Sequence, residues 1–188
     1  MCARMDSLRG RLLIASPALT DPNFRRTVVL ICEHSDEGAL GLVLNRTTEL
    51  PAEDAAPELA EVLGAGSRLF AGGPVQPQSV VLLADFADAD VRPEEALMIS
   101  GTTGLVLSGA EIDAVAAQAE RARAFLGYAG WGPEQLEGEM ERDDWIEVEA
   151  EPGDAFTEDP DGLWAAALVR KGGEYTLLAT MPPDPSQN

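Results

Sequence analysis

The chain has 188 residues, of which 45% are hydrophobic, and 13 basic and 33 acidic residues give it a formal net charge of −20. This length suits one domain with a substantial core. An anionic body repels nucleic acid and acidic membranes, so direct DNA binding and membrane association are not expected. The charge is uneven, because residues 1–46 carry a net charge of +1 and the remainder −21. An anionic partner would therefore approach the N-terminal part of the chain.

The two cysteines, Cys2 and Cys32, do not suggest a disulfide framework, which fits a reducing compartment. Cys32 lies within an apolar run, where a small buried thiol is expected. No apolar run approaches the roughly 18 residues that span a bilayer. The run that follows the N-terminal arginines, Leu12–Ala15, is also too short for a secretory signal. We therefore expect a cytoplasmic protein.

The first part of the chain predicts three strands. Runs rich in Val, Ile and Leu, each bounded by turn residues, favour strands over Leu12–Ala15, Thr27–Cys32 and Ala39–Leu44. The Ser35-Asp36-Glu37-Gly38 segment favours a hairpin between the last two. Prolines predict a turn-rich loop over residues 16–22 between the first two.

The rest of the chain alternates predicted strands and helices. Strands are expected over Arg68–Ala71, Val80–Ala84, Leu97–Ser100, Gly104–Leu107, Phe125–Ala129, Trp145–Val148 and Tyr175–Thr180. Helices are expected over Ala55–Leu63, from the capping box of Ser108 and Glu111 to Arg123, over Glu134–Arg142, and over Leu163–Val169 with Asp161 as its cap. The connections are a polar stretch over Thr47–Glu53, an acidic loop over Asp85–Glu95, and loose tails at residues 1–8 and 182–188. This irregular order predicts an α+β fold, with a mixed sheet and flanking helices in a single domain over residues 1–188.

Four segments form a distinctive set. They are LLIASPALTDPNFRRTVVLICEHSDEGALGLVLNR (residues 12–46), GGPV (72–75), FLGYAGWGPEQLEGE (125–139) and PPDPSQN (182–188). Together they resemble the YqgE/AlgH family of bacterial proteins, over almost the whole chain. The resemblance implies a compact α+β domain on a mixed, partly barrel-like sheet, and a regulatory role, for instance in transcription, without an established enzymatic activity. The chain departs from the family at Glu134, where relatives usually have Gly, and lacks a histidine that many carry after GGPV.

The sequence contains no catalytic constellation. His34 is the only histidine and stands beside Glu33, but a metal site needs three or four converging ligands, so a locally hydrogen-bonded strand end is favoured. Cys32 is expected to be buried and poorly ionised, which disfavours a Cys-His dyad. Gly72 and Gly73 could present backbone N–H groups to an anion, although glycine pairs more often mark sharp turns. We expect no catalytic residue, metal or cofactor.

The most useful candidate is a basic spot formed by Arg25, Arg26 and Arg46 on an acidic protein. If the adjacent arginines stay solvated, they are ordinary surface charges. If one turns inward, its guanidinium would pair with a carboxylate such as Glu33 or Asp36 and fix the loop before it. In the functional interpretation, the spot binds a partner.

Three functions follow from these features. We expect a non-enzymatic regulatory or adaptor protein that binds another protein. The alternative is an enzyme or small-ligand binder, with a cleft between the Ser16–Phe24 loop, the Gly72-Gly73-Pro74 bend and Trp131. Glycines on both sides leave the Trp131 ring open, although core packing is its favoured role. A DNA-binding repressor is disfavoured, because no helix has the basic character of a recognition helix.

Overall fold

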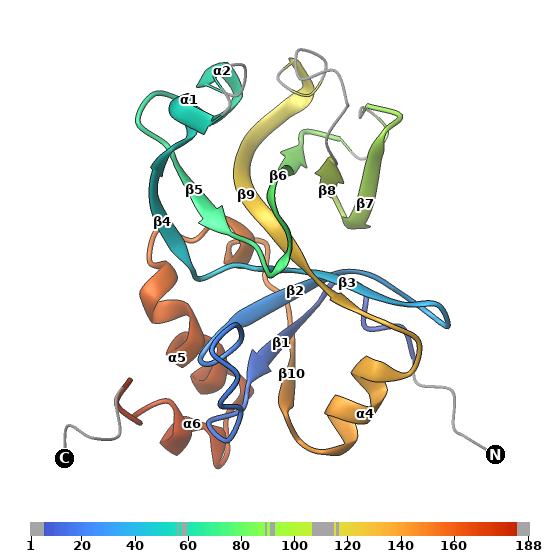
Figure 1. The fold of residues 1–188 in the computed structure, drawn as a ribbon, viewed down its shortest axis with the longest axis vertical. Coiled ribbons are helices and arrows are strands. Elements are labelled where there is room, and N and C mark those ends of the chain that lie inside the picture. Colours follow the sequence, from blue (N-terminus) through green and yellow to red (C-terminus); the bar gives the residue numbers. More distant parts are fainter. Residues whose placement is uncertain are drawn as a thin grey trace.

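The chain folds around one strongly curved β-sheet, and helices cover its outer faces (Figure 1). The computed structural model describes residues 6–55, 57, 60–88, 90, 93–106, 115 and 117–183. The strands of this part of the chain are β1 (Arg11–Ala15), β2 (Val28–Ser35), β3 (Gly38–Val43), β4 (Thr47–Pro51), β5 (Arg68–Ala71), β6 (Val75–Phe86), β7 (Ala96–Ser100), β8 (Thr103–Val106), β9 (Ala119–Trp131) and β10 (Trp145–Glu149). Its helices are α1 (Ala52–Ala55), α2 (Ala60–Leu63), α4 (Gln135–Glu141), the short 3-10 helix η2 (Asp154–Phe156), α5 (Pro160–Lys171) and α6 (Tyr175–Leu178).

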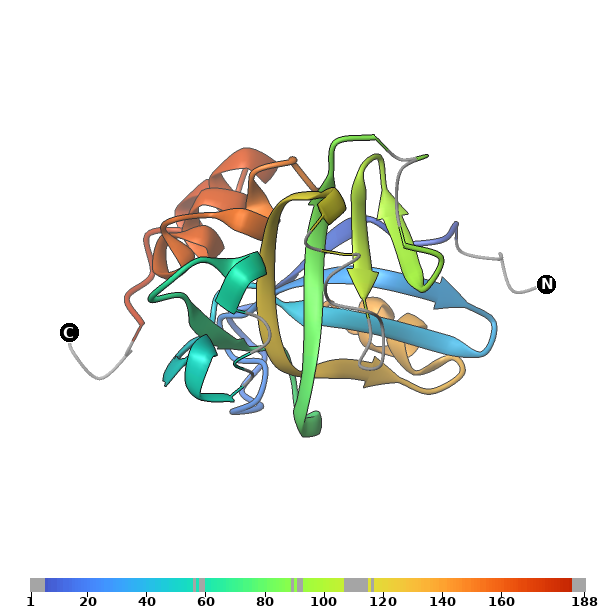
Figure 2. The same ribbon diagram turned by 90° about the horizontal axis from the view of Figure 1, so that it is seen from above.

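The sheet has the strand order β10-β1-β2-β3-β9-β6-β8-β7, and β4 and β5 form a branch that joins β9. The β5–β9 pair is parallel, and the other pairs are antiparallel. The sheet curls so that β7, at one end of this order, lies against β2 (Figure 2). The Arg9 guanidinium adds a hydrogen bond to the Met98 carbonyl of β7. The predicted α+β fold, with a mixed and partly barrel-like sheet flanked by helices, is confirmed.

The lower half of the sheet in Figure 1 is covered on both faces. In β1, Leu12 and Ile14 belong to the apolar cluster that includes α5. Leu13 and Ala15 belong to the opposite cluster, which includes α4. Successive strand residues point to opposite faces, so a strand buried on both faces needs an unbroken apolar run. This requirement explains the continuous Val, Ile and Leu runs from which the first strands are predicted.

Most predicted elements are confirmed. The first three strands are β1, β2 and β3, and the last two form the expected hairpin, in which Ser35 pairs with Gly38. The predicted strands that follow correspond to β5, β6, β7, β8, part of β9 and β10, and the predicted acidic helix corresponds to α4. Strand β6 is longer than predicted, because it begins at Val75 and includes Asp85 and Phe86 of the predicted acidic loop.

Strand β9 joins the two halves of the sheet, and its first residues correct a predicted helix. The expected capping residues Ser108 and Glu111 lie outside the described residues. Residues 115, 117 and 118 are helical as predicted, but the end of the predicted helix, from Ala119 to Arg123, is strand. Ala and Arg favour helices intrinsically. Here the ladder with β6 places Arg121 opposite Asp85 instead. Alternating arginines and alanines suit a strand with one apolar face, so tertiary pairing overrides helix propensity.

The segment predicted as a strand over Tyr175–Thr180 forms helix α6. Tyr175, Leu178 and Ala179 pack together against the core. Their spacing of three and four residues places them on one helix face. The Ala179 N–H donates to the Tyr175 carbonyl at 3.1 Å. The strand propensity of Tyr and Thr is therefore outweighed by burial of a helical apolar face.

Two further predictions are corrected, one for the segment after β3 and one for the cap of α5. The polar connection predicted over Thr47–Glu53 contains strand β4, in which Thr47 pairs with Phe70 of β5. Threonine fits a pleated strand well, which accounts for the difference. The cap of α5 is Asp159 rather than Asp161, since an Asp159 carboxylate oxygen accepts from the Gly162 N–H at 3.0 Å.

The helix predicted over Ala55–Leu63 is represented by two short helices. Helix α1 ends at Ala55 and α2 begins at Ala60. Residues 56, 58 and 59 of the predicted helix lie outside the described part of the chain. None of the helices in the described ranges is long and apolar enough to cross a membrane.

The Gly72-Gly73 pair lies where the connection between β5 and β6 crosses β9. A Cβ atom on Gly72 would lie 2.3 Å from the Gly127 carbonyl oxygen, and one on Gly73 would lie 2.2 Å from the Tyr128 carbonyl carbon. Both contacts are too close for any side chain. The Gly72 N–H also donates to the Leu126 carbonyl at 2.8 Å. The glycine pair therefore allows two backbones to cross in contact.

Candidate functional site

The loop before β2 is held in shape by its own hydrogen bonds. The Asp21 carboxylate accepts from the Asn23 N–H at 2.8 Å. The Asp21 carbonyl accepts from the Arg25 N–H at 2.7 Å, and the Thr27 hydroxyl donates to the Phe24 carbonyl at 2.7 Å. Asp and Thr commonly fix turns by such local bonds. The loop therefore presents Arg25 and the residue after it from a fixed backbone.

Arg26 has a backbone conformation that side-chain-bearing residues rarely adopt, with φ of 56°. Asn45, which follows β3, stabilises it from the neighbouring segment. The Asn45 side chain donates to the Arg26 carbonyl at 2.9 Å and accepts from the Val28 N–H at 2.8 Å. This double contact fixes the direction in which the Arg26 side chain leaves the loop.

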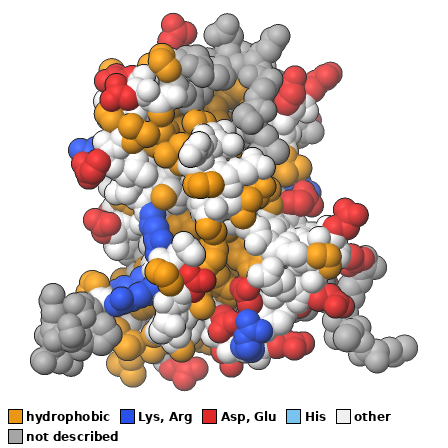
Figure 3. Space-filling model, in the orientation of Figure 1, with side chains coloured by type: hydrophobic (Ala, Val, Ile, Leu, Met, Phe, Trp, Pro, Cys, Tyr) orange, Lys and Arg blue, Asp and Glu red, His pale blue; other side chains and the backbone are white. Residues whose placement is uncertain are grey.

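Arg25, Arg26 and Arg46 lie together with Trp164, and we call these four residues the arginine face. The Arg26 guanidinium stacks over the Trp164 ring at 3.9 Å from its centroid. Arg46 donates to the Arg25 carbonyl at 3.2 Å and to the Pro22 carbonyl at 2.9 Å. Figure 3 shows a short stripe of basic side chains at the lower left of this face of the molecule. The structure thus brings the three predicted arginines together.

None of these three guanidiniums forms an ion pair with a carboxylate of the described residues, whereas six other arginines do. Burial lowers the pKa of Arg26, and the charge of Arg25 adds to this effect. Burial also lowers the pKa of Arg46, which the charge of Asp21 partly offsets. Arginine stays protonated despite such shifts. The arginine face is therefore a cationic spot whose members weakly repel one another.

The end of the described chain lies on the arginine face. Arg26 donates to the carbonyl of Met181 at 3.0 Å and to that of Pro182 at 3.3 Å. Arg25 donates to the carbonyl of Pro183. Two residues of the predicted loose tail, Pro182 and Pro183, are thus in contact with the body of the protein. The two arginines bind three successive backbone carbonyls.

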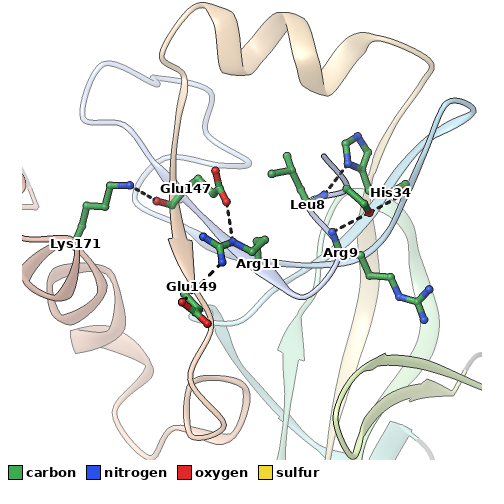
Figure 4. A network of polar contacts seen from close by, with 8 residues as sticks. Leu8, Arg9, Arg11, His34, Glu147, Glu149 and Lys171 are labelled. Carbon is green, nitrogen blue, oxygen red and sulfur yellow. Dashed lines mark hydrogen bonds and ion pairs between the residues drawn. The ribbon is translucent and has the colours of Figure 1, made fainter. Parts of the chain in front are cut away.

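Glu33 and His34 lie away from the arginine face and act locally. The His34 ring nitrogen Nδ1 accepts from the Leu8 N–H at 3.0 Å (Figure 4), and Nε2 donates to Glu137 at 3.0 Å. Because a backbone N–H only donates, these contacts assign the neutral tautomer with hydrogen on Nε2. Glu33 forms a long ion pair with Arg9 at 3.9 Å. Leu8, within the predicted N-terminal tail, is buried by this arrangement.

Trp131 is 6% exposed and packs in the core, which is the role that the sequence favours for it. Phe24 stacks on it at 6.2 Å, and Trp145 meets it edge-on at 6.0 Å. One oxygen of Glu139 accepts from both indole N–H groups at 2.8 Å. The predicted cleft between the Ser16–Phe24 loop and Trp131 is therefore occupied by packed rings.

A cavity of about 160 Å³ lies elsewhere, between the β7–β8 turn and the segment after β10. Its floor is formed by the apolar side chains Leu12, Leu30 and Leu44. At its rim, the Asp85 carboxylate accepts from Thr102 at 2.5 Å and from two nitrogens of Arg121 at 3.1 and 2.9 Å. This carboxylate is therefore already paired.

The carboxylates at the opposite rim of the cavity are also paired with an arginine. Asp154 is 7% exposed and accepts two hydrogen bonds from Arg170, at 3.1 and 2.8 Å. Glu151 pairs with the same guanidinium at 3.0 Å. A bidentate pair of this kind is strong and geometrically specific. The charges around the cavity are thus matched within the protein.

The described residues contain no cluster of three or more His, Cys, Asp and Glu side chains that could hold a metal ion. Cys32 is fully buried, and this burial raises the pKa of its thiol far above the ordinary value, with the charge of Glu33 adding to the effect. A thiol that stays protonated is a poor nucleophile. Cys32 is therefore a core residue rather than a nucleophile.

Sequence reasoning missed Asn45, Trp164 and the C-terminal segment as parts of this face. Asn45 directly precedes Arg46 at the end of a predicted strand, where an asparagine often bonds to backbone, so a weak signal existed. Trp164 lies in a predicted helix, and nothing in the sequence relates it to Arg26. The contact joins residues far apart in the chain and needs the folded sheet.

The curved mixed sheet and its covering helices define an α+β domain. A family model described as AlgH-like, DUF179, matches residues 12–176, and the chain belongs to this family. The resemblance to the YqgE/AlgH family is thereby confirmed. The chain is 42% identical over 187 residues to a UPF0301 protein of Streptomyces coelicolor, covering 98% of this chain and 97% of the relative. It is 41% identical to a UPF0301 protein of Mycobacteroides abscessus, covering 95% and 87%.

Two solved structures share the fold. A crystal structure of a protein from Corynebacterium diphtheriae has a TM-score of 0.82 at 28% identity and covers 96% of this chain and 95% of that chain. The solution structure of the AlgH protein from Pseudomonas aeruginosa has a TM-score of 0.74 at 30% identity, with coverage of 97% and 98%. The similarity therefore extends over almost the whole chain.

Proposed function

We propose that this protein is a cytoplasmic, non-enzymatic regulatory or adaptor protein that binds a protein partner through the arginine face. The observation that carries the proposal is the charge arrangement. In a chain with 13 basic and 33 acidic residues, opposite charges are abundant. Arg25, Arg26 and Arg46 nevertheless remain without an ion pair to any described carboxylate. Their charges are available to a partner.

The chemistry of the face indicates what such a partner offers. Guanidinium groups donate several hydrogen bonds in a fixed plane and suit carboxylates and backbone carbonyls. Arginine is also among the residues that most often dominate binding energy at protein interfaces. The acidic body around the face repels nucleic acid, which favours a protein partner over DNA. A partner segment with carbonyl or carboxylate acceptors would meet this requirement.

The proposal is tested by capture of partners from a native lysate, followed by mass spectrometry. The wild type is compared with the double charge reversal Arg25→Glu/Arg26→Glu. The matched control is Arg68→Glu/Arg142→Glu, which changes the net charge equally at two exposed arginines, with side chains 57% and 63% exposed. We expect a protein captured by the wild type and the control but lost from the first variant. Equal capture by all three proteins would contradict a role for the arginine face.

A second candidate function, binding of a small molecule, is favoured by the cavity at the β7–β8 turn. Its volume of about 160 Å³ is close to that of an engineered cavity that binds benzene, and below the roughly 300 Å³ at which ligand pockets usually begin. A ligand there would have few atoms and an apolar body, placed on Leu12, Leu30 and Leu44. A thermal-shift screen of such small molecules tests this, because a specific ligand stabilises the native state. Absence of any shift at saturating concentrations would contradict it.

A further inference from the structure

We propose that the chain's own C-terminal segment, residues 181–183, is a displaceable occupant of the arginine face and shows which partner the face takes. That partner is a proline-containing polypeptide segment that offers backbone carbonyls. This inference rests on the proposed function, because it names the partner class of the same surface. It also adds a form of regulation, since a partner must displace the segment before it binds.

The contacts of the segment are those of a bound peptide. Three consecutive carbonyls, of Met181, Pro182 and Pro183, accept from the guanidiniums of Arg25 and Arg26. Such contacts recognise the backbone rather than particular side chains. Two successive prolines favour the extended polyproline conformation and leave no backbone N–H to be satisfied. The face therefore matches a proline-containing segment, through three successive carbonyl acceptors.

Stacking on Trp164 holds the Arg26 guanidinium, one of the two donors, in place before any peptide binds. Arg26 lies on the Trp164 ring, and the Trp164 indole N–H donates to the Ala15 carbonyl at 3.0 Å, so the ring itself is held by β1. Asn45 fixes the Arg26 backbone from the other side. A donor group that is already ordered loses less conformational entropy on binding. The arginine face is thus preorganised for carbonyl acceptors.

The segment is also exposed enough to detach from the arginine face. Met181, Pro182 and Pro183 are exposed, with Met181 at 42%. The preceding helix α6 packs on the core through Tyr175 and Leu178, so the attachment point stays fixed when the segment detaches. A segment tethered this closely competes at an effective concentration in the millimolar range. It would lower the apparent affinity for a partner without closing the face completely.

The test uses a fluorescent peptide with the sequence of residues 180–185, TMPPDP, titrated to millimolar concentration into full-length proteins. Its binding is followed by anisotropy and by the Trp164 indole resonance. The variant Pro182→Gly/Pro183→Gly loosens the tethered segment, because glycine is conformationally freer than proline. We expect this variant to bind the peptide about tenfold more tightly than the wild type.

Two combined variants give the controls. Adding Arg25→Glu/Arg26→Glu to the loosened variant is expected to abolish peptide binding, whereas adding Arg68→Glu/Arg142→Glu is expected to leave it unchanged. The inference is overturned if the peptide binds none of the proteins, binds the wild type and the loosened variant equally, or binds despite the reversal at residues 25 and 26. A partner that still depends on the arginine face in the lysate experiment would then support the proposed function alone.

Discussion

The arginine face and the rim of the cavity both concentrate arginines, but they use them differently. At the cavity, Arg121 and Arg170 each form hydrogen-bonded ion pairs, with Asp85 and Asp154. On the arginine face, Arg25 and Arg26 donate to neutral carbonyls of an exposed segment, and Arg26 also stacks on Trp164. A matched and buried pair contributes to the folded state when it is intact, whereas an exposed unmatched charge contributes little to folding. The difference separates arginines that are paired within the folded structure from arginines whose charges no described carboxylate matches.

Removal of one member of the buried pair should give the largest loss of stability. Asp154→Ala leaves the Arg170 guanidinium without its bidentate partner and the Glu151 N–H without its acceptor. We expect the free energy of unfolding to fall by about 3 kcal/mol. Urea denaturation measures this fall. Asp154→Asn, which keeps the shape and one acceptor but removes the charge, should lose less. An equal loss in both variants would contradict this expectation, because it would assign the whole loss to the charge.

Glu139→Ala should give an intermediate effect, because it removes the shared acceptor of two indole N–H groups. Leaving these donors without a partner in the aromatic cluster of Trp131 and Trp145 should cost about 2 kcal/mol. Glu139→Gln retains an acceptor oxygen and should recover part of this loss. If both variants unfold at the wild-type urea concentration, the carboxylate does not support the cluster.

The double reversal Arg25→Glu/Arg26→Glu should change stability by no more than about 1 kcal/mol, the size of the lost stacking on Trp164. The same denaturation experiment compares it with Asp154→Ala. A loss as large as that of the buried pair would break the distinction between the two regions, because the arginine face would then be a structural element.

The smallest effect is expected in the chemical labelling of Cys32, which lies in the core. In a Cys2→Ser background, Cys32 should not react measurably with a thiol reagent at pH 8, since burial raises the thiol pKa and the thiolate is the reactive form. Reaction should appear only at the rate of unfolding. Rapid labelling of the native protein would reveal an accessible nucleophile and reopen the case for an enzyme.

Local pattern predicts the core of this fold well, but not its long-range pairings. The strands of residues 12–44 are predicted because burial on both faces requires unbroken apolar runs. The start of β9 is mispredicted as helix, because its alanines and arginines form a strand only against β6. Helix α6 is mispredicted as strand, because its apolar face is defined by the core that it covers.

The candidate site is predictable only in part for the same reason. Adjacent arginines in an acidic chain mark Arg25 and Arg26 in the sequence itself. Their stacking partner Trp164 and the carbonyl of Met181 are more than 130 residues away in the chain. Such contacts depend on how α5 and α6 pack on the sheet, which no local pattern records.

The most direct test of the central claim is the affinity of a captured partner, measured by titration calorimetry against three folded proteins. These are the wild type, Arg25→Glu/Arg26→Glu and the control Arg68→Glu/Arg142→Glu. If the arginine face binds the partner, the first variant should bind at least about thirtyfold more weakly, as expected when interface arginines are reversed, and the control should match the wild type. Equal affinity for all three proteins would contradict the claim.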